Sequence, residues 1–311
     1  MREAGAGEAI AQLARRASQL REELGRVVDG ARTDVVYCER RGRRRMVGAS
    51  PVDVSALFRG EVLQRVPAVV MTSATLTAGG SFDFVKRRLG IDFEVDEAAL
   101  PSPFDHASQA ALYLPELPDP RAPSYADAAA AEVQRLVALT GGGAFVLCTS
   151  VRMMTALASL CRPALRVPVL AQGEAPKNAL LDRFRRSGDA VLFATMSFWE
   201  GVDVPGDALR LVVIDKLPFD VPTDPLIEAR CRRLSEEGES PFLRYLVPSA
   251  ALTLKQGFGR LVRSRRDRGV VAILDSRIRT KGYGAIFLKS LPEAARCSTF
   301  AEVEAFWSAL G

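Results

Sequence analysis

Short apolar patterns run through the first hundred residues. Residues 8–28 place apolar side chains three or four positions apart, which predicts an amphipathic helix that ends near Gly30 and needs a partner surface. Residues 33–39 and 44–49 have the pattern of two strands around an arginine-rich turn. The apolar run PAVVM at 67–71 predicts a short strand that leads into the hydroxyl-rich TSAT. These patterns together predict a partial α/β segment.

A longer and more regular alternation begins after a proline-rich stretch at 100–124. Strand-like apolar runs cover 110–114, 144–148, 167–170, 190–195, 209–214 and 269–274. Helical patterns lie between them, at about 124–139, 151–160, 176–187, 224–237 and 243–263. Buried strands that alternate with helices predict a parallel sheet covered by helices on both faces. Ligands bind such sheets outside the carboxyl ends of the strands, so we expect the informative residues directly after strands.

Composition places the chain among globular proteins and leaves room for two domains. The 311 residues are 48% hydrophobic and 25% charged, which is an ordinary globular balance. No apolar run approaches the roughly 18 residues that would span a bilayer, and the first residues lack the apolar core of a secretory signal. We therefore expect a cytoplasmic protein with no membrane partner.

Cysteine and histidine usage argues against metal chemistry within this chain. The five cysteines are scattered with no C-x-x-C pair, and His106 is the only histidine. This pattern predicts no metal site and no iron–sulfur cluster built from these residues alone. The net charge of +5 is concentrated in RRGRRR (40–45) and RLVRSRRDR (260–268), which favours a nucleic-acid partner.

The segment QGFGRLVRS carries the strongest functional signal. At about 100° per residue, Gln256, Arg260 and Arg263 would share one face of a continuous helix. Two arginine forks suit a phosphate group whose negative charge grows during transfer. The other interpretation is a solvated basic face with incidental glycines. Gly257 and Gly259 favour the functional interpretation. Each destabilises a helix interior by roughly 1 kcal/mol, which suggests a site where the backbone must be approached closely.

A second segment, SFWEGVDVPG, directly follows the predicted strand AVLFAT. Glu200 and Asp203 can accept hydrogen bonds from a ribose hydroxyl or position a water molecule. Gly201 lets the backbone approach a ligand closely. The alternative is an ordinary turn in which Trp199 is merely packed.

Hydroxyl side chains follow two further predicted strands. TSATL presents Ser73 and Thr75, which can contact phosphates or relay a change between two sites. CTSVRMM presents Thr149 and Ser150 at the start of a predicted helix, with Arg152 beside them, where a nucleic-acid phosphate can bind. A helix cap or Ser/Thr turn is the alternative for both segments.

Together with DKLPF, and in this order, these segments resemble the later motifs of DinG/XPD-type superfamily 2 helicases. The resemblance covers about residues 33–290. It implies two RecA-like domains that bind ATP and single-stranded DNA between them, 5′ to 3′ translocation, and a role in DNA repair. It also implies that the sheet predicted above is RecA-like.

The resemblance assigns roles to the residues named above. Arg260 and Arg263 correspond to arginine fingers, and Gln256 lies at the same nucleotide interface. Glu200, Gly201 and Asp203 correspond to the motif that links nucleotide to DNA. The residues expected to contact DNA or to couple the two sites are Ser73, Thr75, Thr149, Ser150, Arg152 and Trp199.

Two motifs of such helicases are absent from this sequence. No Gly-Lys dipeptide occurs, so the phosphate-binding G-x-x-x-x-G-K-[ST] is missing, and no acidic Mg²⁺ motif precedes TSATL. We therefore expect residues 1–100 to be the C-terminal remnant of a first RecA-like domain with a leftover arch-type helix. Residues 101–311 would form the second domain. ATP with Mg²⁺ would be held mainly by a missing N-terminal half, and the isolated chain would be inactive. A free-standing RecA-like module that binds nucleic acid without catalysis remains the alternative.

Overall fold

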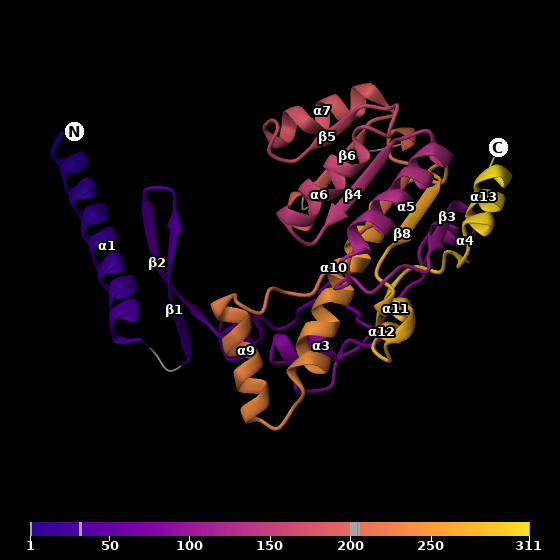
Figure 1. Ribbon diagram of the computed structural model, residues 1–311. Coiled ribbons are helices and arrows are strands. Elements are labelled where there is room, and N and C mark those ends of the chain that lie inside the picture. Colours follow the sequence, from indigo (N-terminus) through magenta and orange to yellow (C-terminus); the bar gives the residue numbers. More distant parts are fainter. Residues whose placement is uncertain (1, 31–32, 200–203, 205, 311) are drawn as a thin grey trace. The chain divides into compact units, whose positions relative to one another are not determined.

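The computed structural model describes residues 2–30, 33–199, 204 and 206–310 (Figure 1). The chain divides into two compact units. The small unit comprises Met1–Met71, Val85–Phe93 and Asp220–Arg244, and the large unit comprises Thr72–Phe84, Glu94–Phe219 and Tyr245–Gly311. This division differs from the expected single boundary at residue 100. Residues 220–244 join the small unit, where Arg230 donates to the Val52 carbonyl oxygen over 3.0 Å.

The large unit is built on a seven-stranded sheet whose described strands all pair in parallel, in the order β5-β6-β4-β7-β8-β3-β9. The strands are β3 (Ala110–Tyr113), β4 (Ala144–Cys148), β5 (Val169–Ala171), β6 (Val191–Thr195), β7 (Leu211–Ile214), β8 (Gly269–Ile273) and β9 (Ala295–Cys297). The predicted parallel sheet is confirmed, and each of its six predicted strands is present. The short strand β9 was not predicted.

Helices cover both faces of this sheet. The helices of the large unit are α4 (His106–Gln109), α5 (Tyr125–Thr140), α6 (Val151–Cys161), α7 (Lys177–Ser187), α8 (Met196–Trp199), α10 (Val247–Phe258), α11 (Arg277–Thr280), α12 (Gly284–Ser290) and α13 (Phe300–Ala309). Short 3-10 and π-helical turns occur at Gly206–Ala208 and Phe242–Leu246. Alternate residues of one strand meet different helices. Val146 of β4 lies in the cluster with α5 and α6, whereas its neighbour Phe145 packs on Phe184 of α7 with ring centroids 4.5 Å apart.

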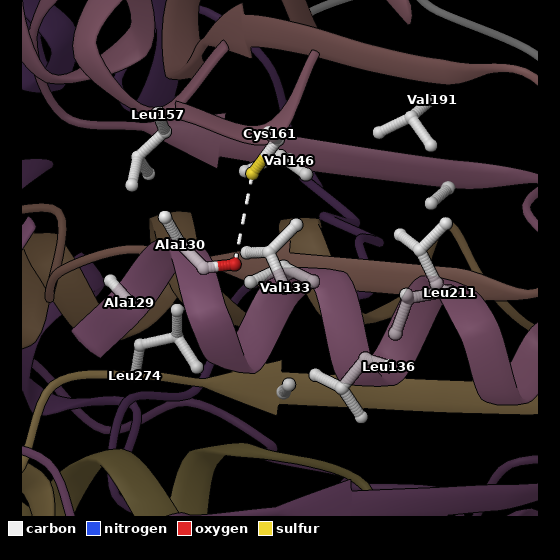
Figure 2. Close-up of a cluster of buried hydrophobic side chains, with 14 of the residues drawn as sticks. Ala129, Ala130, Val133, Leu136, Val146, Leu157, Cys161, Val191, Leu211 and Leu274 are labelled. Carbon is white, nitrogen blue, oxygen red and sulfur yellow. Dashed lines mark hydrogen bonds between the residues drawn. The ribbon is translucent and has the colours of Figure 1, made fainter. Parts of the chain in front are cut away.

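The core lies between the sheet and helix α5. Figure 2 shows Ala130, Val133 and Leu136 of α5 beside Val146 and Leu211 of the strands. Val133, Leu136, Val146 and Leu211 have no exposed surface. Full burial of such side chains contributes about 1.5–3 kcal/mol each. The sheet is therefore the rigid base on which loops at the strand ends are held.

The Gly141–Gly143 segment joins α5 to β4. All three glycines have positive φ, between 62° and 83°, a conformation that side chains other than glycine rarely adopt. A Cβ atom on Gly142 would lie 1.8 Å from the carbonyl oxygen of Asp189. The segment is a tight turn between a helix and a strand.

The small unit contains a long helix, a hairpin and short helices. Its elements are α1 (Arg2–Asp29), β1 (Asp34–Arg41), β2 (Arg44–Pro51), α2 (Ser55–Phe58), a π-helical turn (Arg59–Leu63), the greater part of α3 (Asp83–Arg88) and α9 (Pro225–Glu236). Strands β1 and β2 pair antiparallel. Helix α1 confirms the helix predicted at 8–28, and its apolar side chains Ile10 and Leu13 are 66% and 64% exposed.

The strand predicted at 67–71 is wrong, because these residues are irregular and Val70 is 88% exposed. A strand needs a neighbour for its backbone N–H and C=O groups. No described strand pairs with this stretch. None of the described helices is long and apolar enough to cross a membrane.

Candidate functional site

The carboxyl ends of β4 and β7 bring two segments of the site together. Thr149 directly follows β4 and Asp215 directly follows β7, and the two strands are paired. The fully buried Asp215 carboxylate accepts the Thr149 backbone N–H over 2.9 Å and the Lys216 backbone N–H over 2.6 Å. The Thr149 hydroxyl lies 3.4 Å from the same carboxylate. Asp215 therefore holds the Thr149 backbone in place.

Burial governs the ionisation of this carboxylate. It raises the pKa of Asp215 to about 6, although the Thr149 N–H and the Lys216 ammonium favour the charged form. The Tyr125 hydroxyl donates to the Asp215 backbone carbonyl oxygen, which fixes the strand end from the side of α5. The DKLPF motif that contains Asp215 is weak by itself, so sequence reasoning did not assign it a role.

Ser150 and Arg152 lie at the start of α6. The Ser150 side chain caps the helix by accepting the Met153 backbone N–H over 3.2 Å. Both Ser150 and Arg152 are exposed. The helix-cap interpretation is therefore confirmed for Ser150. Ser150 is also exposed at the N-terminus of α6, a position where anions bind favourably.

A third strand end, that of β8, carries a buried ion pair. Asp275 has no exposed surface and accepts the backbone N–H of Leu217 over 2.9 Å. The Arg277 guanidinium donates to the same carboxylate over 2.6 and 2.8 Å. This hydrogen-bonded pairing with Asp275 raises the pKa of Arg277 above its usual value. Asp275 thus ties the loop after β7 to the end of β8.

The segment after β6 is described only in part. Thr195, the last residue of β6, donates its backbone N–H and its hydroxyl to the Gln172 side chain over 2.8 and 2.9 Å. Helix α8 follows and ends at Trp199. Glu200, Gly201 and Asp203 lie outside the described residues, as does the Trp199 side chain.

The predicted helix through QGFGRLVRS ends early. Helix α10 stops at Phe258, and Arg260 and Arg263 lie in the turn beyond it, so the three polar side chains do not share one helical face. The two glycines at 257 and 259 explain this, because glycine is a poor helix former. Gln256 is exposed on the last turn of α10, and Arg260 and Arg263 are half-buried.

A buried carboxylate holds the turn that carries these arginines. Asp267, only 6% exposed, accepts the backbone N–H groups of Arg263 and Ser264, each over 2.8 Å. It also accepts the Ser264 hydroxyl over 2.6 Å. The Gln109 side chain, which directly precedes β3, donates to the backbone carbonyls of Ser264 and Asp267 over 2.9 Å each. Sequence reasoning missed Asp267 and Gln109; an acid inside a basic run was the only signal.

Burial also acts on the arginine itself. It lowers the pKa of Arg263 below its usual value, and the nearby Asp267 carboxylate opposes that shift. The Arg263 Nε–H donates to the Arg260 carbonyl oxygen over 3.3 Å. The turn thus carries the guanidinium groups of Arg260 and Arg263 on a backbone that buried side chains hold in place.

The segment TSATL (72–76) is followed by Thr77, which contacts α10. The hydroxyls of Ser73 and Thr75 lie 3.1 Å apart, and the Ser73 hydroxyl accepts the Thr75 backbone N–H over 3.1 Å, which forms a Ser/Thr turn. Thr77 is 3.3 Å from the Lys255 ammonium of α10. The coupling residues expected from the sequence therefore belong to a segment that contacts the helix bearing Gln256.

Topology separates the site into two groups on opposite edges of the sheet. The carboxyl-edge group follows β4, β7 and β8 and contains Thr149, Asp215 and Asp275. The amino-edge group, with Asp267 and Arg263, precedes β8 and is bonded to Gln109, which precedes β3. The expectation that informative residues directly follow strands is therefore wrong for QGFGRLVRS. Hydroxyls and a helix N-terminus at one edge suit a phosphate backbone, and arginine forks at the other suit a phosphate group.

Comparisons with known proteins give the family to which this chain belongs. Residues 133–294 match the family model of the helicase C-terminal domain. The chain is 44% identical over 258 residues to the ATP-dependent DNA helicase YoaA of Escherichia coli, covering 83% of this chain and 40% of that protein. It is 37% identical over 308 residues to the ATP-dependent helicase DinG of Mycobacterium tuberculosis, covering 96% of this chain and 46% of that protein.

The chain therefore spans less than half the length of these two relatives. A solved structure of an XPD helicase superposes with a TM-score of 0.59 at 13% identity, over 86% of this chain and 48% of that one. At this identity the likeness shows a common fold.

Proposed function

Because this chain belongs to the helicase C-terminal domain family, we propose that it is the C-terminal motor portion of an ATP-dependent DNA helicase of the DinG/XPD type. The observation that carries the proposal is the family match over residues 133–294, which includes the carboxyl-edge group and the amino-edge group. The remaining motor half corresponds to the part of the relatives that this chain does not span.

At the amino edge, Arg260 and Arg263 act as arginine fingers, with Gln256 at the same nucleotide interface. Phosphoryl transfer depends on positioning and on stabilising the negative charge that develops on the transferred group. Two guanidinium forks on a turn fixed by Asp267 supply that charge stabilisation. Glu200, Gly201 and Asp203 complete the nucleotide contacts in this proposal.

This proposal assigns the rest of the ATP site to the other motor half. The absent Gly-Lys dipeptide leaves no phosphate-cradling loop in this sequence. ATP with Mg²⁺ would therefore be held mainly by the other half, and when bound the ion would neutralise phosphate charge.

At the carboxyl edge, Thr149, Ser150 and Arg152 contact the phosphates of single-stranded DNA. A helix N-terminus, a hydroxyl and an exposed arginine are common phosphate ligands. Trp199 contributes to the same track, and Ser73 and Thr75 couple the two sites. Translocation runs 5′ to 3′ in this proposal.

Reconstitution tests the proposal directly. The isolated chain should show no DNA-stimulated ATP hydrolysis, because fingers stabilise charge on a phosphate that another part must hold. Adding the N-terminal half of a close relative, fused or as a separate polypeptide, should restore turnover. Strong ATPase activity from the chain alone, lost in Arg260→Ala, would contradict the proposal.

A second candidate function is a nucleic-acid-binding module without catalysis. One observation favours it: the carboxyl-edge group lies wholly within one compact unit, so binding there needs no second motor half. Under this candidate the chain binds single-stranded DNA with steep salt dependence, yet the added N-terminal half never restores ATP hydrolysis. Reconstituted turnover decides between the two functions.

A further inference from the structure

The tip of the β1–β2 hairpin concentrates positive charge. Five of the six residues at positions 40–45, here called the hairpin tip, are arginine. Gly42, with φ of +61°, and Arg43 form the two-residue connection between the strands. Glycine at the first position suits the tight turns that such hairpins use. Arg40, Arg43, Arg44 and Arg45 are all exposed.

The strand register places like charges opposite one another. Arg40 pairs with Arg45 across the two strands. Cross-strand neighbours have Cβ atoms about 4.5–5.5 Å apart, and like charges in that position destabilise a hairpin. The fold therefore carries an electrostatic cost at the tip that a neutral or mixed-charge pair would avoid.

Within the described residues, no acidic side chain offsets this charge. No ion pair involves Arg43, Arg44 or Arg45 there, and the Arg40 side chain donates only to the Gly42 carbonyl oxygen, over 3.2 Å. The arrangement elsewhere in the small unit differs. On α9, Arg232 pairs with Glu228 over 3.0 Å. Among the described residues, Arg43, Arg44 and Arg45 therefore carry their charges without an acidic partner.

We propose that the hairpin tip binds the phosphodiester backbone of single-stranded DNA. Arginine matches phosphate because its planar fork donates two parallel hydrogen bonds to the phosphate oxygens. A polyanion would also relieve the repulsion between Arg40 and Arg45. The proposal shares its nucleic-acid partner with the proposed function but requires neither ATP nor the arginine fingers.

The test compares two triple variants of this chain by fluorescence anisotropy with labelled oligothymidylate. The first variant is Arg43→Gln, Arg44→Gln, Arg45→Gln. The matched control is Arg15→Gln, Arg16→Gln, Arg21→Gln on α1, where the three arginines are also exposed. Both variants lie in the small unit and lower the net charge by the same amount.

The tip variant should lower affinity by roughly tenfold to a hundredfold at low salt. It should also reduce the slope of log K against log salt by about 2, because each phosphate contact on a single strand contributes about 0.7. The control should change neither quantity appreciably. Equal losses in both variants would overturn the proposal, since only net charge would then matter.

Two further arms identify the partner. Loss of binding to duplex DNA in the tip variant, with oligothymidylate binding unchanged, would overturn the assignment to single strands. Polyglutamate that competes as well as oligothymidylate, with DNA binding insensitive to the tip, would point to an acidic protein and overturn the proposal. The variant Arg43→Lys, Arg44→Lys, Arg45→Lys keeps the charge and should retain most of the affinity.

Folding is monitored by circular dichroism. Removing like charges should leave the unfolding temperature of the glutamine variant unchanged or raise it. If that variant unfolds, the single change Arg45→Gln carries the test, with a smaller expected slope change of about 0.7. All binding is measured without nucleotide, so this test and the reconstitution test are independent. A tip variant that binds DNA normally would not contradict the proposed function, and a failed reconstitution would not affect the binding result.

Discussion

The two edges of the large unit's sheet hold their polar groups by different means. At the carboxyl edge, Thr149 and Asp215 meet because β4 and β7 are paired, and the buried Asp215 carboxylate then accepts the Thr149 backbone N–H. At the amino edge, Arg263 lies in a turn beyond the end of α10, and Asp267 and Gln109 fix the backbone of that turn. Buried carboxylates act at both edges, but at the carboxyl edge they add to positions that paired strands already set, whereas Arg263 lies in a turn that side chains hold.

The largest expected effect separates the two edges by function. In the reconstituted enzyme, Arg260→Ala or Arg263→Ala should lower ATPase activity by about 10³-fold, as for other arginine fingers. DNA affinity without nucleotide should change little, because the proposed DNA contacts are at the other edge. Arg296→Ala, an exposed arginine on β9, serves as the matched control and should leave ATPase unchanged. An equal loss of ATPase activity and DNA affinity would contradict the proposal that the two edges serve different ligands.

The carboxyl edge should respond to pH through Asp215. Its pKa is raised from 3.8 to about 6 in the folded chain, so the folded state binds more protons than the unfolded state between those values. The free energy of unfolding should therefore fall as pH rises from about 4 to about 6, by up to about 3 kcal/mol from this group. Urea unfolding of the wild type and Asp215→Asn across this range measures the effect. A difference between them that does not vary with pH would contradict it.

Removing the carboxylate at the amino edge should loosen the arginine turn. Asp267→Ala leaves the backbone N–H groups of Arg263 and Ser264 without their acceptor. An unsatisfied group costs about 1–3 kcal/mol, so ATPase of the reconstituted enzyme should fall by roughly tenfold. Asp267→Asn keeps one acceptor and should recover part of the activity. DNA affinity is the discriminating measurement, because a general folding defect would lower it as well.

The smallest expected effect tests whether Ser150 does more than cap α6. Ser150→Asp keeps a good N-cap residue but places a negative charge where a DNA phosphate would lie. Thermal stability should remain within about 1 kcal/mol of the wild type, while DNA affinity falls by roughly fivefold. Ser150→Asn is the uncharged control. Unchanged DNA affinity in both variants would limit Ser150 to its structural role.

The sheet was predictable from sequence because its strands are continuous apolar runs. Strand β9 escaped prediction, since it has three residues and an exposed Arg296 at its centre. The run at 67–71 has an equally apolar sequence but no described neighbour to pair with. An apolar run forms a strand only where a neighbouring strand can pair with its backbone, and the run itself does not reveal that neighbour.

The site was predictable only in part. The hydroxyls after β4 follow directly from a strand-then-helix pattern, so sequence placed Thr149 and Ser150 correctly at a strand end. The hydrogen bonds that join Asp215 to Thr149 and Gln109 to Ser264 span 66 and 155 residues, which no local pattern reveals. The helical face proposed for Gln256 and Arg260 failed because local glycines ended the helix.

The strands between the two edges are short and fully enclosed. Strands β4 and β8 have five residues each, so they separate the edges by roughly 17 Å. All residues of both strands are buried, and close-packed interiors resist gradual deformation. The sheet should therefore move as a rigid body. A displacement of the arginine turn at the amino edge would shift the strands together and so reach the carboxyl edge without repacking between them.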